Sequence, residues 1–138
     1  MNKAKEVTYL LLRLAAAFMF IQSGGLKLFD WFGGIPAEHG GHPSVGTLPW
    51  FAGVLEVFGG SLILIGFITR PTAFLLSGMM AVAYFMAHQP QGAWPVQNGG
   101  MPAALYSFIY LFMAAYGGGD FSIDAVVRKK VPNWPSWL

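Results

Sequence analysis

Long apolar blocks separated by short polar segments dominate this chain. Four blocks are expected to form helices, at about residues 7–29, 48–68, 71–87 and 101–117. A helix needs about 20 apolar residues to cross a bilayer. The last two blocks are slightly short, so tilt or local thinning of the bilayer would let them span it. The pattern predicts an all-α fold, a four-helix transmembrane bundle.

Composition places the chain among integral membrane proteins. Only 10% of the 138 residues are charged and 55% are hydrophobic, whereas a soluble domain carries about 25% charged residues. The length favours a single domain over residues 1–138. The chain has no cysteine, which excludes disulfides and zinc thiolate sites in it. It has no nucleic-acid-binding motif, so the expected partner is the lipid bilayer.

Basic residues occur in alternate loops. The loops at about 30–47 and 88–100 contain no Lys or Arg. The positive-inside rule therefore places both termini in the cytoplasm. Residues 120–138 are expected to form an interfacial tail on that side. The N-terminus resembles a signal peptide, but Arg13 interrupts the apolar run and the run continues well beyond it, so cleavage is not expected.

Polar and ionisable side chains within the spans are the candidate site residues, because each needs a partner or water in hydrocarbon. In the first span, one helical face carries both charged residues of the span and has spacings of 4, 3, 4 and 3: Arg13, Ala17, Phe20, Gly24 and Lys27. Gln22 lies off this face. The second span carries one acid, flanked by glycines on its own face. The third ends near a histidine, and the fourth has two tyrosines one turn apart. The candidates are Arg13, Gln22, Lys27, Glu56, His88, Tyr106 and Tyr110.

Each candidate also has a structural interpretation. Lys27 and Arg13 could extend to the lipid head groups. Glu56 could form a structural ion pair or handle a proton. The rise of a helix places Glu56 level with residues 20–22 and Arg13 deeper on the inner side, so depth alone does not decide an Arg13–Glu56 contact. His88 could be an interfacial hydrogen-bonding residue, and the tyrosines could serve packing alone.

No metal or haem is expected. The loop sequence EHGGH, with His39 and His42, has two histidines three residues apart, but no helix holds them in a ligating geometry. His88 is the only histidine near a span and has no evident axial partner for haem iron.

The ordered set of motifs resembles the DoxX family of small bacterial membrane proteins. The motifs are RLAAAFMFIQSGGLK, GVLEVFGGSLILIGFITR, AYFMAHQPQGAW and QNGG. The resemblance covers about residues 7–125. It depends on Arg13, Gly24, Lys27, Glu56, Gly60, Gly66 and Arg70, and less distinctively on His88 and Asp124.

The resemblance implies a compact four-helix bundle and an association with redox chemistry, since some relatives are subunits of a thiosulfate:quinone oxidoreductase. One departure concerns the residue after QNGG, which is often acidic in relatives and is Met101 in this chain.

The leading hypothesis is an inner-membrane subunit whose polar pocket binds a quinone or similar small molecule. Glu56 would handle a proton or accept a hydrogen bond, and Arg13 would stabilise its charge. Lys27 and His88 would polarise a quinone carbonyl, with Tyr106 and Tyr110 lining the pocket. Quinone would be the only redox group, or electrons would come from elsewhere, such as an oxidoreductase partner subunit. The alternatives are a non-enzymatic membrane interaction or scaffold protein, and a small proton-coupled transporter. Enzymatic activity and homo-oligomerisation stay open.

Overall fold

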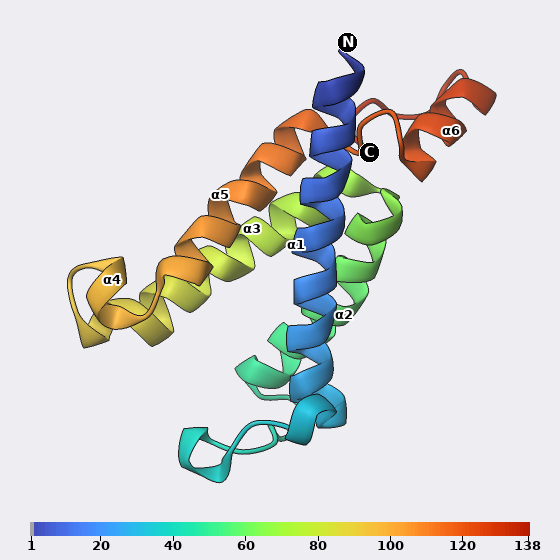
Figure 1. Cartoon of the computed structure of the whole chain (residues 1–138). Coiled ribbons are helices and arrows are strands. Elements are labelled where there is room, and N and C mark those ends of the chain that lie inside the picture. The colour runs from blue at the N-terminus through green and yellow to red at the C-terminus, as the bar shows by residue number, and fades with distance from the viewer. Residues whose placement is uncertain (1) are drawn as a thin grey trace. The chain divides into compact units, whose positions relative to one another are not determined.

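The computed structural model describes residues 2–138, and within this range the regular structure is helical, with no strand. The chain divides into two compact units, one ending at Gly66 and the other covering Phe67–Leu138 (Figure 1). Helices Lys3–Phe29 and Leu48–Ile65 and the continuous helical run Thr69–Gln91 are long and apolar enough to cross a membrane; Met101–Tyr116 is apolar but shorter. The all-α prediction is confirmed. Assembly of the four spans into one bundle and the cytoplasmic location of both termini stay predictions.

The first unit is a hairpin of α1 (Lys3–Phe29) and α2 (Leu48–Ile65), joined by a loop with two 3-10 turns, η1 (Trp31–Gly33) and η2 (Ala37–His39). The Asn2 side chain accepts a hydrogen bond from the Ala4 N–H at 3.0 Å and begins α1. Helix α1 therefore starts four residues before the expected position 7.

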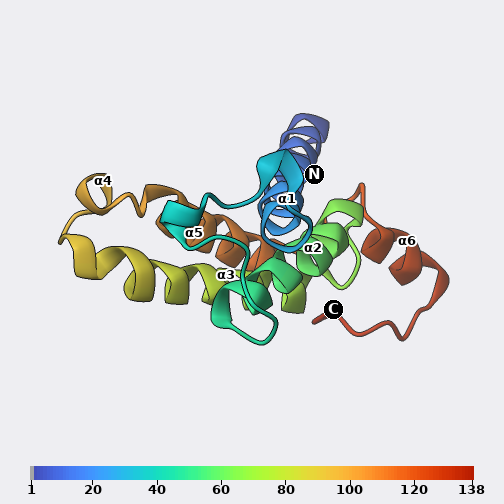
Figure 2. The ribbon, with the colours of Figure 1, turned by 90° about the horizontal axis from the view of Figure 1, so that it is seen from below.

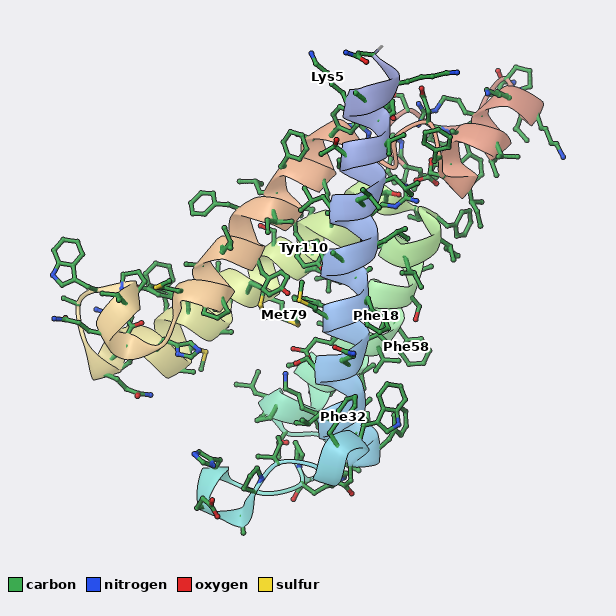
Figure 3. The ribbon with its side chains drawn as sticks, in the orientation of Figure 1. Lys5, Phe18, Phe32, Phe58, Met79 and Tyr110 are labelled. Atoms are coloured by element: carbon green, nitrogen blue, oxygen red, sulfur yellow. The ribbon has the colours of Figure 1, made fainter. Side chains whose placement is uncertain are left out.

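Small residues let the two helices of this hairpin approach closely. A Cβ atom built on Gly24 would lie 2.7 Å from the Gly53 carbonyl oxygen, and one on Gly60 would lie 3.2 Å from the Ala17 carbonyl oxygen. Such close approach of backbones is typical of small residues at membrane helix interfaces. Gly24 and Gly60 therefore allow α1 and α2 to pack closely. Large apolar residues instead cover the outside, where Phe18 and Phe58 are 58% and 66% exposed (Figure 3).

The second unit pairs α3 (Thr69–Ala83) with α5 (Met101–Tyr116), which run side by side in both ribbon views (Figure 2). Two serines link the helices reciprocally. The Ser77 hydroxyl donates to the Ser107 carbonyl at 2.7 Å, and the Ser107 hydroxyl donates to the Ser77 carbonyl at 3.1 Å. Apolar side chains fill the rest of the contact, among them Leu76, Tyr110 and Met113, each fully buried.

The connection between α3 and α5 is more helical than the sequence suggested. Helix α3 continues through a π-helical turn, η3 (Tyr84–His88), and a 3-10 turn, η4 (Gln89–Gln91), and a short α4 (Pro95–Asn98) follows. Most of η3 falls within the predicted third span, whereas η4 and α4 were not predicted because they are short and contain Pro and Gln.

The C-terminal segment is held against the starting end of α3. Helix α6 (Ile123–Lys130) buries Asp124, whose two carboxylate oxygens accept hydrogen bonds from the Ile68 N–H at 2.8 Å and the Thr69 N–H at 2.9 Å. Ile68 has a φ of 50°, an unfavourable left-handed conformation for a β-branched residue. Asp124 therefore stabilises both a strained turn and the free N–H groups that begin α3.

Arg70 stabilises the C-terminal end of helix α5. Its guanidinium donates to three successive carbonyl oxygens at the end of α5, those of Ala114 at 3.3 Å, Ala115 at 2.5 Å and Tyr116 at 3.3 Å. A cation at the C-terminal end of a helix also opposes the negative end of the helix dipole. The sequence analysis had named Arg70 for the family resemblance, without this structural role.

Substituting Gly24 tests the close contact in the first unit. Gly24→Ala is expected to lower the unfolding free energy by about 1–3 kcal/mol, because the added methyl group overlaps backbone atoms of α2. Gly78→Ala is the matched control, since a Cβ atom at Gly78 meets nothing within 4 Å. Thermal melting in detergent measures both. Equal melting temperatures for the two variants would contradict the close approach.

Substituting Asp124 tests the cap on α3. Asp124→Asn keeps one acceptor oxygen but places an NH₂ group against a backbone N–H, which is expected to cost about 1–3 kcal/mol. Glu38→Gln, an exposed acid in the loop of the first unit, is the control. The measurement is the melting temperature of the purified protein. A melting temperature equal to that of the control would show that Asp124 does not stabilise the helix start.

Candidate functional site

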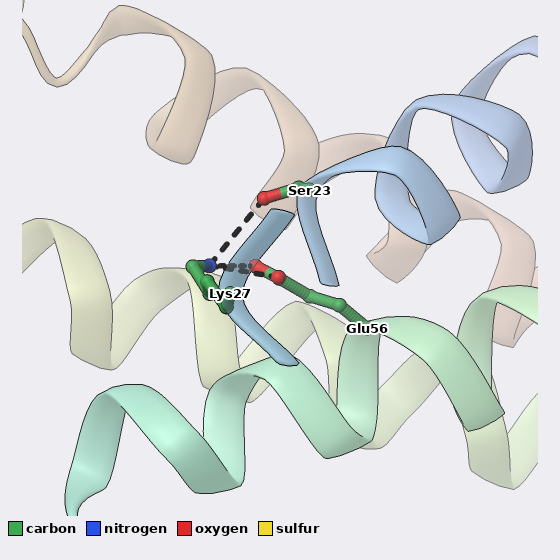
Figure 4. Close-up of polar contacts among 3 residues, drawn as sticks. All are labelled: Ser23, Lys27 and Glu56. Carbon is green, nitrogen blue, oxygen red and sulfur yellow. Dashed lines mark hydrogen bonds and ion pairs between the residues drawn. The ribbon is translucent and has the colours of Figure 1, made fainter. Parts of the chain in front are cut away.

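A buried ion pair lies within the first hairpin, between Lys27 of α1 and Glu56 of α2. The Lys27 ammonium donates to both carboxylate oxygens, at 2.6 Å to Oε1 and 2.7 Å to Oε2 (Figure 4). It also donates to the Ser23 hydroxyl at 3.4 Å, one helical turn earlier on α1. These three residues form the polar cluster of the first unit.

Glycine spacing explains how the two charges meet. A Cβ atom on Gly53 would lie 3.1 Å from the Lys27 Cβ atom, so the base of the lysine side chain lies directly against α2. Glu56 follows Gly53 by three residues and therefore projects from the same face, one turn further along. The lysine side chain bends along α2 toward this carboxylate. The alternative in which Lys27 extends to the head groups is not the arrangement observed.

The two members of the pair differ in access. The Glu56 side chain is 3% exposed and the Lys27 side chain is 22% exposed. A buried carboxylate without a counter-charge is strongly unfavourable, so Lys27 makes burial of Glu56 tolerable. The ammonium remains partly accessible, so the pair can be approached from the lysine side.

Lys27, rather than Arg13, lies against Glu56. The contact of Ala17 with Gly60 sets the register of the antiparallel hairpin and places Arg13 beside the end of α2. Along the helix, that position is about 12 Å from the level of Glu56. The hypothesis that Arg13 stabilises the Glu56 charge stays a prediction, and the ammonium that lies against this carboxylate is that of Lys27. Arg13 is buried, at 2% exposure, on the predicted face of α1.

The sequence analysis missed a buried acid on the same face. Glu6 is 3% exposed, and Glu6, Tyr9 and Arg13 continue the predicted face at spacings of 3 and 4. The signal was present in this spacing. It was overlooked because the helix was expected to begin at residue 7, which left Glu6 in the polar N-terminal segment.

Asn98 organises the loop end of the second unit. Its side chain donates to the Gly92 carbonyl at 2.9 Å and accepts from the Gly100 N–H at 2.8 Å, and its backbone carbonyl lies 3.1 Å from His88 Nδ1. A carbonyl only accepts hydrogen bonds, so Nδ1 of His88 is the donor in this contact. The QNGG motif had been used for the family resemblance without a role for Asn98.

The tyrosines and Gln22 occupy different settings. The Tyr106 and Tyr110 rings stack with centroids 6.1 Å apart, and Tyr110 is fully buried (Figure 3). Gln22 is partly exposed and lies off the polar face, as its spacing indicated. The ion pair belongs to the first unit, and His88 and the tyrosines belong to the second. One pocket lined by all of them stays a prediction.

Metal-binding groups are not clustered in the described part of the chain. Across residues 2–138, no group of three or more His, Cys, Asp or Glu side chains is placed to hold a metal ion. In the loop of the first unit, His42 Nδ1 lies 2.9 Å from an Asp30 carboxylate oxygen, and both side chains are exposed.

Sequence comparison assigns this architecture to a family. Residues 8–89, which include the whole ion-pair hairpin from Thr8 onward, match the DoxX family. The chain belongs to the DoxX family. A related protein of Haemophilus influenzae, described as uncharacterized, is 37% identical over 86% of this chain and 90% of its own length. Inner membrane protein YqjF of Escherichia coli is 31% identical over 94% of this chain and 99% of its own length. No solved structure matches significantly.

Together with the apolar helices, the comparisons establish a multi-pass protein of the bacterial inner membrane. Within this DoxX protein, the Lys27–Glu56 pair combines a buried acid with a partly accessible base. Such an arrangement can bind an oxygen-bearing ligand at the ammonium and hold a proton at the carboxylate.

A double-mutant cycle tests the ion pair. Lys27→Met or Glu56→Leu alone is expected to cost about 3–5 kcal/mol, because each leaves an uncompensated buried charge. The double variant K27M/E56L should cost less than the sum of the two, because no charge remains. Melting temperatures in detergent give the coupling, and Lys5→Met, at an exposed lysine of the same helix, is the control (Figure 3). Additive effects would contradict the pairing.

Proposed function

We propose that this DoxX protein is a membrane subunit that binds a quinone, or a similar carbonyl-bearing small molecule, at the Lys27–Glu56 pair. The observation that carries the proposal is the difference in access between the two side chains, 22% for the base and 3% for the acid. A ligand oxygen arriving from the lysine side meets a charged donor, and the acid behind it is shielded from water.

The hydrogen bonds of the ammonium support this proposal. Two N–H groups are bound to Glu56 at 2.6 and 2.7 Å, and the third is bound to Ser23 at the longer distance of 3.4 Å. An ammonium has three N–H donors. The third can therefore turn from Ser23 to a ligand carbonyl while the ion pair stays intact.

The carboxylate would serve the proton chemistry of such a ligand. Reduction of a quinone to a quinol takes up two electrons and two protons, and reoxidation releases them. Glu56 is within hydrogen-bond distance of the ammonium that would hold the quinone oxygen, so it can accept or return a proton there. The chain has no cysteine to relay electrons. The proposal therefore assigns electron delivery to a partner subunit of an oxidoreductase system.

A second candidate function is a non-enzymatic scaffold in which the pair only sets the helix register. The saturation of the cluster favours it, because both Glu56 oxygens and all three ammonium donors already have protein partners. A charged pair that fixes one alignment of two helices is a known structural use of buried polar groups.

Quinone binding separates the two candidates. The full-length protein in lipid nanodiscs, washed free of native quinone, is equilibrated with decylubiquinone or menadione, and the bound quinone is extracted and quantified. Binding by the wild type and a loss of tenfold or more in K27M/E56L are expected, because a charge-assisted hydrogen bond contributes about 1.5–3 kcal/mol. Glu56→Gln should retain binding but slow proton-coupled reduction.

The double variant keeps loss of binding distinct from loss of folding, since it removes both charges together. Lys5→Met is the matched control for removal of a lysine. A folded double variant that binds quinone as well as the wild type would support the scaffold. Absence of binding by the wild type with both quinones would reject the proposal.

A further inference from the structure

The C-terminal segment of the second unit presents a surface that is both apolar and basic. Three consecutive cations close helix α6, and all are exposed. Four large apolar side chains of the same segment are 40–66% exposed. We name these residues the tail surface: Phe121, Ile123, Val126, Arg128, Lys129, Lys130 and Trp137.

The hydrogen bonds of Asp124 orient this surface. Asp124 is 1% exposed and bonds the start of α3, so its side of α6 faces the protein. Ile123 and Val126 are three residues apart and share a different side of the helix, where they are 40% and 51% exposed. The apolar side of α6 therefore points away from the unit that holds it.

The same contacts set the depth of α6 in the membrane. Asp124 bonds the N–H groups of Ile68 and Thr69, where the α3 span begins, and Arg70 bonds the carbonyls where α5 ends. Helix α6 thus lies level with the ends of both helices, at the end of the unit opposite α4 (Figure 1). For helices that cross a bilayer, this level is the boundary between hydrocarbon and head groups.

Within the described residues 2–138, Arg128, Lys129 and Lys130 make no ion pair or side-chain hydrogen bond. The only acid between residues 121 and 138 is Asp124, which is buried and already bonded. A concentrated positive charge beside exposed apolar groups, held at the interface, is complementary to anionic lipid.

We propose that the tail surface binds anionic phospholipids. Arg128, Lys129 and Lys130 contact the phosphate head groups, and Ile123, Val126 and Trp137 enter the boundary of the acyl chains. Trp is well suited to this boundary because its ring is apolar and its indole N–H is polar. Each basic residue near an anionic surface strengthens binding about fivefold. The surface therefore selects phosphatidylglycerol over phosphatidylcholine.

Energy transfer from Trp137 to labelled lipid tests the proposal. The full-length protein is placed in vesicles of phosphatidylcholine and phosphatidylglycerol that contain a dansyl tracer of either lipid. The signal of Trp137 is obtained as the difference between the wild type and Trp137→Phe. We expect severalfold more transfer to dansyl-phosphatidylglycerol than to dansyl-phosphatidylcholine, with the preference falling as salt is raised.

Two matched charge variants test whether the three cations cause the lipid preference, and a third variant tests the apolar contact. R128Q/K129Q/K130Q should reduce the ratio of the two signals to near one, and R128K/K129R/K130R, which keeps the charge, should retain it. In vesicles with brominated acyl chains, quenching of Trp137 should fall in I123S/V126S. Helical circular dichroism confirms that each variant is folded.

Three results would overturn the proposal. One is a wild-type ratio of one, which means no head-group preference. Another is an unchanged ratio in R128Q/K129Q/K130Q. The third is an absence of Trp137 quenching by brominated lipid in every vesicle, which would place the tail surface in water or against another protein.

Discussion

Burial of the Glu56 carboxylate is the constraint on which the first unit depends. A charge within a membrane helix needs a counter-charge inside the protein, because hydrocarbon offers neither water nor counterions. Gly24, Gly53 and Gly60 let α1 and α2 pack so closely that the Lys27 side chain lies against α2. This close packing brings the lysine ammonium to the Glu56 carboxylate. The ion pair therefore depends on the close contact between the α1 and α2 backbones. Any ligand at the pair would contact this hairpin.

In the second unit, the polar groups that need partners are the backbone N–H and C=O groups at the helix ends. The start of α3 and the end of α5 each leave backbone groups without helical partners. Asp124 accepts from the N–H groups of α3, and Arg70 donates to the carbonyls of α5. Each side chain has the charge that opposes the local helix dipole. The C-terminal segment is consequently part of the folded unit, and α6 is held where the spans end.

Helical periodicity predicted the faces of the spans better than it predicted the partners on them. The face of α1 that carries Arg13 and Lys27 is buried or partly buried as expected, and the acid on α2 faces it. The partner of Glu56 could not be chosen from depth alone, because the level of each cation relative to Glu56 depends on the helix register, which the sequence does not fix. Glu6 was missed because helix ends are the least certain part of a periodic pattern.

Sequence alone determined the all-helical class, the apolar spans and the face on which the charges lie, because these follow from composition and a local repeat of 3.6 residues. The tertiary structure decided which charges meet. Lys27 lies 29 residues from Glu56 along the chain, and Asp124 lies 55 from Thr69. Contacts across such separations depend on how closely two backbones pack and in which register, and the backbone contacts of Gly24 and Gly60 set both in the first hairpin.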